Sequence, residues 1–376
     1  MKISRVTCYE VIVPAREGSI ESKDTHKPLH KLPVGAKSDW SVQFDQLPKL
    51  IVKLDLESGV TGWGELYRNH DWRVVEEIAR MLLETDIESL TLQKLPFAYS
   101  REYDGFECAI WDATAKACGL RVVDLLGGPL KTKVKVGAWS SYRHVEEIEQ
   151  LVTGFQQEGY DCIKFKCDLD DDVNTWCRII ADAAPEMQVI LDPNERWAYT
   201  HEARKRMDQL SEIGNVLCLE DPIPRWKLDD YAALRTYSSI PIVLHVSLPY
   251  IMHGQRIHDA IQAIQLHAVD GFNFNGGLAD FQRMDHIAAA AGLPCWHGSE
   301  VDLGILEAMY VHSSAAASSC IWPGDIFGRM IREHDLLKTP LAMEPPYVLL
   351  PEGPGLGVEP DEQAIANYQI KHKEYL

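Results

Sequence analysis

The stretch Cys162-Ile163-Lys164-Phe165-Lys166-Cys167 alternates apolar and cationic side chains with a period of two. This period predicts a β-strand that places the Lys164 and Lys166 ammonium groups on one side. Two like charges on a short strand repel each other unless anionic groups face them. One interpretation is an edge strand whose lysines discourage aggregation. The segments on either side decide whether this interpretation or a functional one holds.

Similar short apolar runs recur along the chain at intervals of about 25 residues, and helical segments separate them. The helical segments include 144–157, 201–213 and 278–291. With the lysine strand, the eight strand-like runs are 134–141, 162–167, 188–194, 216–222, 241–247, 271–275, 294–299 and 319–324. This alternation predicts an α/β fold, a modified TIM (β/α)7-8 barrel over residues 129–338, more than an open sheet. No glycine-rich phosphate loop follows the first strand, which argues against a dinucleotide-binding domain.

The segments that flank the barrel predict a second, smaller unit. Residues 2–13 and the hairpin 50–65 read as strands, and 72–90 and 106–126 read as helices, so residues 1–128 form an α+β layer. The loop 14–46 is locally basic, which fits either a solvated arm or a mobile lid over an anionic ligand. The tail 339–376 is expected to pack back on this layer.

Composition excludes several classes of partner. The chain has 376 residues, 46% of them apolar, and a formal net charge of −19, so nucleic acid and anionic membranes are repelled at long range. Its nine cysteines include no CxxC pair, which fits reduced, buried thiols. The N-terminus is a poor secretory signal and no run is long enough to span a bilayer. We therefore expect a soluble, cytoplasmic protein.

Polar residues follow the apolar runs where each barrel strand should end, and chemistry gathers at such ends. Asp192, Glu220 and His245 end three consecutive runs, so two carboxylates and one imidazole converge. This donor set suits a divalent metal, and by ligand type iron or zinc fits as well as magnesium. For each residue alone, a helix cap or a core histidine is the alternative. The other strand ends carry Asn194, Asp221, Asn273, Asn275, His297 and Asp325.

The carboxylates of such a metal site would be the anionic groups that face the lysine strand. A free lysine has a pKa of about 10.4, and a second ammonium and a nearby dication both favour the neutral amine. Lys166 is therefore the candidate base and Lys164 its electrostatic partner. Such a base suits removal of a proton next to a carboxylate, since a metal can stabilise the enediolate that forms. His297 would approach from the opposite side and donate a proton.

Several motifs together resemble the enolase superfamily, in its mandelate racemase and muconate lactonizing branch. They are the helix Phe106-Glu107-Cys108-Ala109-Ile110-Trp111-Asp112 with Leu125-Leu126-Gly127-Gly128, Lys164-x-Lys166, Asp192-x-Asn194-x-x-Trp197, Glu220-Asp221-Pro222 and Gly276-Gly277-Leu278. The resemblance implies a capping domain built from both termini over a barrel site that holds Mg²⁺. It also implies that Lys166 abstracts the α-proton of a carboxylate substrate and that Asp192 and Glu220 bind the metal.

The chain departs from the family pattern on two strands. The fifth strand usually ends in a carboxylate, whereas this chain offers His245, a ligand found in a few acid-sugar dehydratases. A neutral ligand leaves the site more positive and favours an anionic substrate. Cycloisomerases and dipeptide epimerases place a lysine on the sixth strand, but this strand ends in Asn273-Phe274-Asn275 and no lysine occurs between Lys227 and Lys338.

These features lead us to expect a Mg²⁺-dependent dehydratase of a sugar acid or hydroxy-diacid, in which Lys166 removes the α-proton and His297 assists loss of hydroxide. The alternatives are a racemase, epimerase or cycloisomerase of a carboxylate, a non-catalytic carboxylate-binding homologue, and a Schiff-base aldolase. Predicted substrate contacts are Asn194, Asn275 and Glu300, with Asp325 a further candidate. The expected partner is a small-molecule carboxylate, and a homo-oligomer is also expected.

Overall fold

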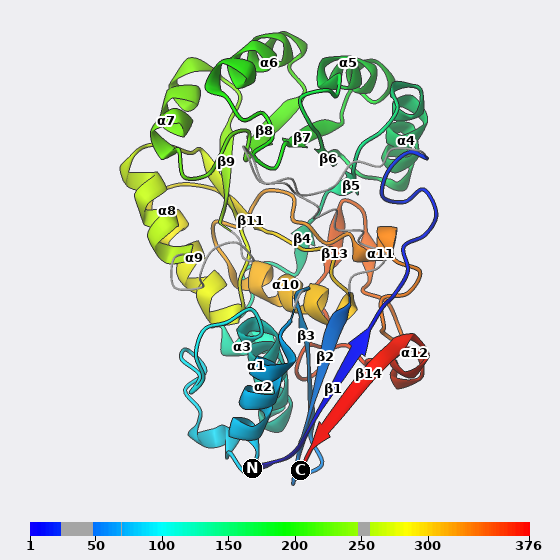
Figure 1. The fold of residues 1–376 in the computed structure, drawn as a ribbon, viewed down its shortest axis with the longest axis vertical. Coiled ribbons are helices and arrows are strands. Elements are labelled where there is room, and N and C mark those ends of the chain that lie inside the picture. Colours follow the sequence, from blue (N-terminus) through cyan, green and yellow to red (C-terminus); the bar gives the residue numbers. More distant parts are fainter. Residues whose placement is uncertain (24–47, 69, 247–255) are drawn as a thin grey trace.

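The computed structural model describes residues 1–23, 48–68, 70–246 and 256–376. Residues 24–46 of the predicted lid loop 14–46 lie outside the described part. The described chain forms two lobes, a barrel-like lobe and a smaller lobe that contains both termini (Figure 1). The predicted class, an α/β barrel with an α+β layer, is confirmed. The exact domain boundaries stay a prediction.

The larger lobe is built on a curled, seven-stranded parallel sheet in the order β11-β10-β9-β8-β7-β6-β5. Both faces of these strands are largely buried, as parallel sheets require. The strands are β5 (Ala138–Ser140), β6 (Cys162–Lys166), β7 (Gln188–Asp192), β8 (Val216–Glu220), β9 (Ile242–Val246), β10 (Gly271–Phe274) and β11 (Cys295–His297).

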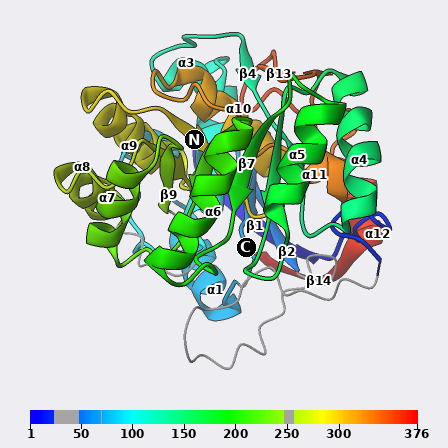
Figure 2. The same ribbon diagram turned by 90° about the horizontal axis from the view of Figure 1, so that it is seen from above.

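A helix follows each strand of this sheet, and seen from above the helices surround it (Figure 2). The helices are α4 (Val145–Glu158), α5 (Val173–Ala183), α6 (Thr200–Ile213), α7 (Leu228–Tyr237), α8 (Arg256–Gln265), α9 (Leu278–Ala290) and α10 (Gly304–Ala316). The short helix α11 (Gly328–Ile331) comes after them in the chain.

The predicted eighth strand, 319–324, is not a strand. It forms isolated parallel bridges, Cys295↔Cys320 to β11 and Val136↔Gly324 beside β5, and so touches both edges of the sheet. Pro323 interrupts this segment and has no N–H to donate, which limits pairing to single bridges. The barrel thus has seven strands and closes through this segment.

The first predicted strand, 134–141, is divided between two sheets. Its second part is β5, whereas its first part, β4 (Lys133–Lys135), pairs with β13 (Tyr347–Leu349). β13 pairs in turn with β12 (Met343–Glu344), giving a small sheet outside the barrel.

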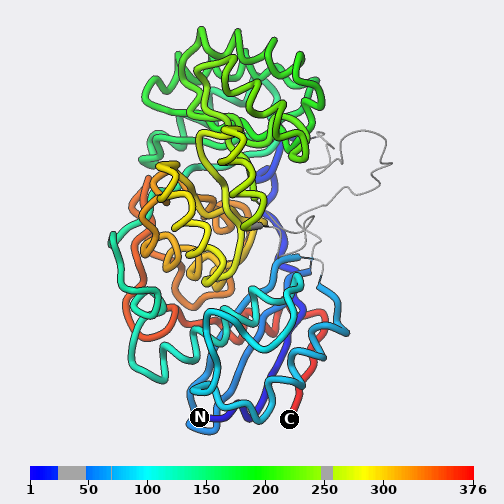
Figure 3. The backbone as a smooth tube through the Cα atoms, turned by 90° about the vertical axis from the view of Figure 1, so that its left-hand side faces the viewer, coloured from blue at the N-terminus to red at the C-terminus, as the bar shows by residue number. Residues whose placement is uncertain are grey.

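The smaller lobe contains an antiparallel sheet in the order β14-β1-β2-β3. The pairing of β14, the last strand, with β1, the first, brings the two termini to the same end of the molecule (Figures 1 and 3). The elements of this lobe are β1 (Ile3–Val11), β2 (Lys49–Leu56), β3 (Thr61–Leu66), α1 (Trp72–Leu82), η2 (Ile87–Ser89), α2 (Tyr103–Cys118), α3 (Val122–Leu125), α12 (Glu362–Tyr368) and β14 (Gln369–Tyr375).

Both helices predicted in this lobe are shorter than expected. The segment 72–90 is helical only to Leu82, and a 3-10 turn follows it. The segment 106–126 forms two helices, because Gly119 adopts a left-handed conformation (φ 67°) that ends α2.

The helix α2 holds the smaller lobe against the barrel. Its Glu107 side chain is buried and accepts a hydrogen bond from the Ala279 N–H at the start of α9 (3.1 Å). A Cβ atom on Gly277 would lie 1.7 Å from Glu107 Oε2, so only glycine allows this approach. The Phe106–Asp112 and Gly276-Gly277-Leu278 motifs therefore meet at one contact between the lobes.

Among the described helices, none is both long and apolar enough to cross a membrane.

Candidate active site

The lysine strand β6 lies inside the sheet, hydrogen-bonded to β5 and β7, so the edge-strand interpretation is wrong. Its two lysines share one side, as the period of two predicts. Lys166 Nζ contacts Asp192 Oδ2, and Lys164 Nζ lies 3.5 Å from the same oxygen. Both side chains are buried, with 4% of Lys164 and 9% of Lys166 exposed.

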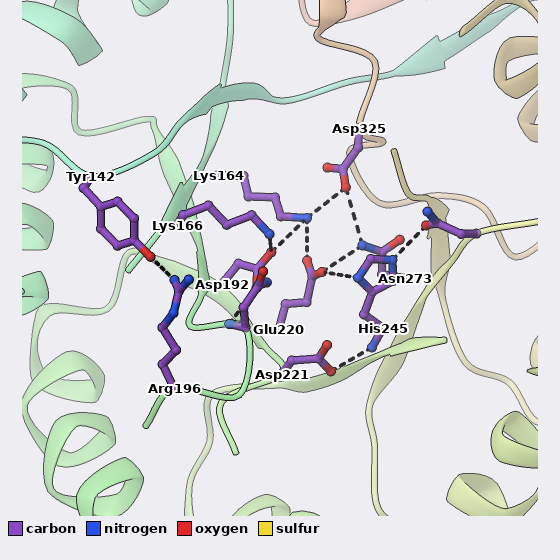
Figure 4. Close-up of polar contacts among 12 residues, drawn as sticks. Tyr142, Lys164, Lys166, Asp192, Arg196, Glu220, Asp221, His245, Asn273 and Asp325 are labelled. Atoms are coloured by element: carbon purple, nitrogen blue, oxygen red, sulfur yellow. Dashed lines mark hydrogen bonds and ion pairs between the residues drawn. The ribbon is translucent and has the colours of Figure 1, made fainter. Parts of the chain in front are cut away.

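Lys164 is the centre of a cluster of carboxylates (Figure 4). Its ammonium lies 2.6 Å from Glu220 Oε2 and 2.8 Å from Asp325 Oδ2, besides its contact with Asp192. Burial alone would lower the pKa of Lys164, but the charges of Asp325, Glu220 and Asp192 outweigh it and raise that pKa well above its usual value. Lys164 therefore stays charged and neutralises part of the cluster.

Asp192 is held in place by the turn that follows β7. The Asn194 N–H donates to Asp192 Oδ1 (3.1 Å), and the Asn194 side-chain amide donates to the same oxygen. Asn194 (φ 46°) and Glu195 (φ 68°) are left-handed, a conformation that asparagine tolerates well. The structure thus places Asn194, a predicted substrate contact, against the predicted ligand Asp192.

His245 at the end of β9 is held by three contacts. Its Nδ1 lies 3.2 Å from Glu220 Oε1, its Nε2 lies 2.8 Å from Asn275 Oδ1, and its backbone N–H donates to Asp221 Oδ1 (2.9 Å). The neighbouring Asp221 carboxylate is largely occupied, since Arg225 Nε lies 2.5 Å from Oδ2. Burial raises the pKa of Asp221 to about 6.

Asn273, on β10, links two of the carboxylates. Its side-chain amide donates to Glu220 Oε1 (2.9 Å) and to Asp325 Oδ2 (3.4 Å). Sequence reasoning noted Asn273 at a strand end but gave it no role. A strand-end position was the signal for Asp325 too, which the structure brings into the cluster beside Lys164.

His297 lies at the end of β11 and is fully buried. Its ring stacks between Phe281 and Tyr310, with centroid separations of 4.4 Å and 4.0 Å, and Nδ1 lies 2.8 Å from the Gly298 carbonyl oxygen. Its carbonyl oxygen accepts the Asp325 N–H (3.0 Å). The neighbouring Trp296 ring lies 5.6 Å from Lys164 Nζ, so the His297 ring is on the opposite face of β11, and the structure does not bring it into the carboxylate cluster.

Glu300, a predicted substrate contact, is paired with a residue of the other lobe. Arg68, just after β3, places Nε 3.0 Å from Glu300 Oε2, and both side chains are buried. Burial raises the pKa of Glu300, while Arg68 opposes the shift. Sequence reasoning missed Arg68, because nothing near it in the chain indicates that the end of β3 reaches the barrel.

The donors in this site fit a divalent cation. Glu220, Asp221 and His245 each offer a ligand atom within 4.8 Å of the others. Since Asp221 is taken by Arg225, Asp192 is the better third donor; Lys164 lies near both Asp192 and Glu220. Carboxylate oxygens are the ligands that Mg²⁺ prefers. The lysine charges offset only two of the three carboxylates, which leaves the cluster suited to further positive charge.

Comparisons with known proteins agree with this architecture. Residues 37–127 match the family described as the mandelate racemase / muconate lactonizing enzyme N-terminal domain, and residues 146–364 match the enolase C-terminal domain-like family. The chain is similar to muconate cycloisomerase 1 of Rhodococcus opacus, with 27% identity over 85% of this chain and 91% of the relative. It is 30% identical to an N-succinylamino acid racemase of Thermus thermophilus over 67% of each chain.

A solved structure shows the same fold. The N-succinyl Arg/Lys racemase from Bacillus cereus superposes with a TM-score of 0.83 over the whole of both chains, at 19% sequence identity. The curated relatives are enzymes of isomerase or lyase type. The chain is therefore an enzyme of the enolase superfamily and belongs to its mandelate racemase / muconate lactonizing enzyme branch.

Proposed function

We propose that the enzyme moves the α-proton of a small carboxylate substrate and returns an isomer, by racemisation, epimerisation or cycloisomerisation. The observation that carries this proposal is the Lys164 and Lys166 pair, buried on one side of β6 and facing Asp192, Glu220 and Asp325. A buried amine can accept a proton from the substrate. The carboxylates beside it can hold a cation, which would attract a substrate that is itself anionic.

The side chains would divide the reaction between them. Lys166 removes the proton from the α-carbon, and Lys164 remains charged because the charges of its carboxylate neighbours raise its pKa. The ring of His297 packs between α9 and α10, on the face of β11 opposite Trp296, so the return of a proton to the same carbon from the other side is not assigned to it. In a cycloisomerisation the substrate's own nucleophile would react instead. A bound Mg²⁺, held by Asp192, Glu220 and His245, would offset negative charge on the carboxylate oxygens.

The named relatives favour an isomerase over the acid-sugar dehydratase expected from sequence. They include an N-succinylamino acid racemase, a muconate cycloisomerase and a D-galactarolactone cycloisomerase, beside o-succinylbenzoate synthases. None of these names is that of an acid-sugar dehydratase, so dehydration of a sugar acid becomes the second candidate.

One observation keeps dehydration as that second candidate. Enzymes with a lysine on each side of the substrate would need one on β10, where this chain places Asn273 against Glu220 and Asp325. A dehydratase can use one group as base and then as acid when the α-proton and the β-hydroxyl leave from the same side, and Lys166 would supply that group. The β-hydroxyl would take the proton that Lys166 has removed from the α-carbon and leave as water.

The test is incubation of the protein and Mg²⁺ with N-acylamino acids, muconate and hydroxy acids in D₂O, followed by ¹H NMR. Loss of the α-proton signal with the substrate otherwise intact, or conversion to a cyclic isomer, supports the isomerase. Formation of a 2-keto acid, detected with semicarbazide, supports the dehydratase. Binding of these carboxylates without exchange or product would overturn both.

A further inference from the structure

The orientation of the His245 ring is fixed by Asn275. His245 Nε2 lies 2.8 Å from Asn275 Oδ1, and an amide oxygen can only accept a hydrogen bond. Nε2 therefore carries a proton and donates it to Asn275. The backbone of β9 supports this arrangement, since the His245 N–H donates to Asp221 Oδ1 (2.9 Å).

This contact determines what the other ring nitrogen can do. In a singly protonated imidazole with Nε2–H, the lone pair is on Nδ1. Nδ1 lies 3.2 Å from Glu220 Oε1, so two electron-pair donors face each other in a buried site. Two such donors at this separation repel unless a proton or a metal cation lies between them. The pair is thus arranged for a cation.

The Asn275 side chain is buried with little freedom. It is fully inaccessible, and its backbone N–H donates to the Val246 carbonyl oxygen (3.2 Å) on β9. A Cβ atom on Gly298 would lie 2.0 Å from Asn275 Oδ1 and 2.2 Å from Asn273 Oδ1. Gly298 therefore leaves the space that both amides occupy, and any larger residue there would displace them.

We infer that Asn275 is a positioning residue that presents the Nδ1 lone pair of His245 to a divalent cation shared with Glu220. This gives Asn275 a different task from the substrate contact expected from sequence. The inference rests on the part of the proposed function that makes His245 a metal ligand. Partners of this kind on the distal nitrogen of a histidine ligand typically change metal affinity or activity by roughly 10–100-fold when removed.

The experiment is titration of the purified protein with Mn²⁺ alone, followed by the EPR signal of free Mn²⁺, with no substrate present. Asn275→Leu keeps the size of the side chain but removes the acceptor, so we expect binding roughly 10–100-fold weaker than wild type. Asn275→Asp keeps an acceptor, and it should bind Mn²⁺ at least as tightly as wild type. Wild-type affinity in a folded Asn275→Leu protein, or weakened binding by Asn275→Asp, would overturn the inference.

A double-mutant cycle separates an effect through His245 from a general effect on the site. If Asn275 acts through His245, adding Asn275→Leu to His245→Ala will not weaken Mn²⁺ binding further. Additive losses would contradict the inference. Gly298→Ala crowds the amides of both Asn275 and Asn273 without changing either residue, and it should weaken Mn²⁺ binding in the wild-type background.

The Mn²⁺ measurements can contradict this inference without contradicting the proposed reaction, and the reverse is also true. Unchanged Mn²⁺ affinity in His245→Ala would remove His245 from the ligand set and the inference with it, while leaving Lys166-dependent proton exchange untouched. Conversely, an absence of proton exchange with every carboxylate would overturn the proposed reaction and leave the Mn²⁺ results standing.

Discussion

In the described part of the chain, the interface cluster and the site cluster are both built of buried charged side chains, and they differ in how fully their polar atoms are paired. The interface cluster, made of Lys49, Glu65, Asp302 and Tyr310, lies where β2 and β3 meet the start of α10. Glu65 accepts the backbone N–H groups of residues 303 (2.8 Å) and 306 (3.0 Å). Asp302 contacts Lys49 and accepts the Tyr310 hydroxyl (2.6 Å). Each charged group in this cluster has a partner within the protein.

The site cluster, made of Lys164, Lys166, Asp192, Glu220 and Asp325, is surrounded by polar atoms that are not all paired. Within the described part of the chain, the buried atoms Asn194 Oδ1, Asn273 Oδ1 and Asn275 Nδ2 have no hydrogen-bond partner. A buried polar atom without a partner costs free energy, so a protein retains several in one place where a ligand supplies the missing contacts. The interface cluster should therefore serve stability, and the site cluster should serve function.

The largest expected effect is on the reaction, from Lys166→Ala. Removal of the proposed base should slow α-proton exchange about 10²–10⁴-fold, the usual contribution of a positioned acid or base. Mn²⁺ affinity and the free energy of unfolding should change little, because Lys164 still contacts Asp192 and Glu220. The measurements are ¹H NMR exchange in D₂O, Mn²⁺ titration and urea unfolding.

Lys135→Ala is the matched control, because Lys135 pairs with Asp161 (2.7 Å) just before the other end of β6. It should leave exchange unchanged. Exchange at the wild-type rate in Lys166→Ala would move the base elsewhere and remove the distinction between the two clusters.

Much of the site cluster follows from sequence periodicity. Parallel strands place their carboxyl ends at one edge, and the alternation in β6 places both lysines on one side, so Lys164, Lys166, Asp192 and Glu220 are expected together. The structure brings them together. Such reasoning needs only local pattern and the geometry common to all barrels.

Contacts between distant segments could not be predicted in this way. The Arg68 and Glu300 pair depends on how the smaller lobe sits on the barrel, and no local pattern encodes that placement. The role of Asn273 depends on the rotamers of two carboxylates from other elements. The eighth strand was over-predicted because apolar composition outweighed Pro323 in the reading of 319–324.

The next largest effect tests the interface cluster, through Lys49→Met. The substitution keeps the aliphatic stem but leaves Asp302 and Glu65 buried without their cation. Breaking a buried pair in this way typically costs about 3–5 kcal/mol of unfolding free energy, which urea denaturation would measure.

Lys53→Met, on the same strand, is the control. Lys53 pairs with the exposed Glu362 (2.9 Å) and lies 5.0 Å from the Trp63 ring centroid, contacts together worth about 1 kcal/mol. Equal losses of unfolding free energy in the two variants would show that burial and complete pairing do not make the interface cluster more stabilising than an exposed ion pair.

Two buried histidines allow the same comparison at smaller scale. His312 accepts the Val123 N–H at Nδ1 (3.1 Å) and contacts the Leu356 carbonyl oxygen through Nε2 (3.0 Å). His312→Phe leaves both backbone groups buried without a hydrogen-bond partner, so it should lower the free energy of unfolding by about 2–4 kcal/mol. His297→Phe preserves stacking between Phe281 and Tyr310, so it should cost less stability than His312→Phe. Because this ring lies on the face of β11 opposite Trp296, proton exchange should stay near the wild-type rate. Loss of exchange in a folded His297→Phe protein would contradict this placement.

The smallest effect is a pH dependence from the interface cluster. Burial raises the pKa of Glu65 from 4.5 to about 7, although Lys49 and two backbone N–H groups oppose the shift. Between these values the folded protein holds a proton that the unfolded chain has lost, so the free energy of unfolding falls as pH rises. The slope contributed by one such proton is at most about 1.4 kcal/mol per pH unit.

Urea unfolding at several pH values would show a flatter profile in Glu65→Gln than in wild type. The pKa of Glu220 in the site cluster is instead held well below its usual value, because the charge of Lys164 outweighs the effect of burial. The ionised Glu220 therefore stabilises the fold at neutral pH, and this contribution is lost only in acid. Parallel pH profiles for wild type and Glu65→Gln would mean that Glu65 stays ionised in the folded protein throughout this range.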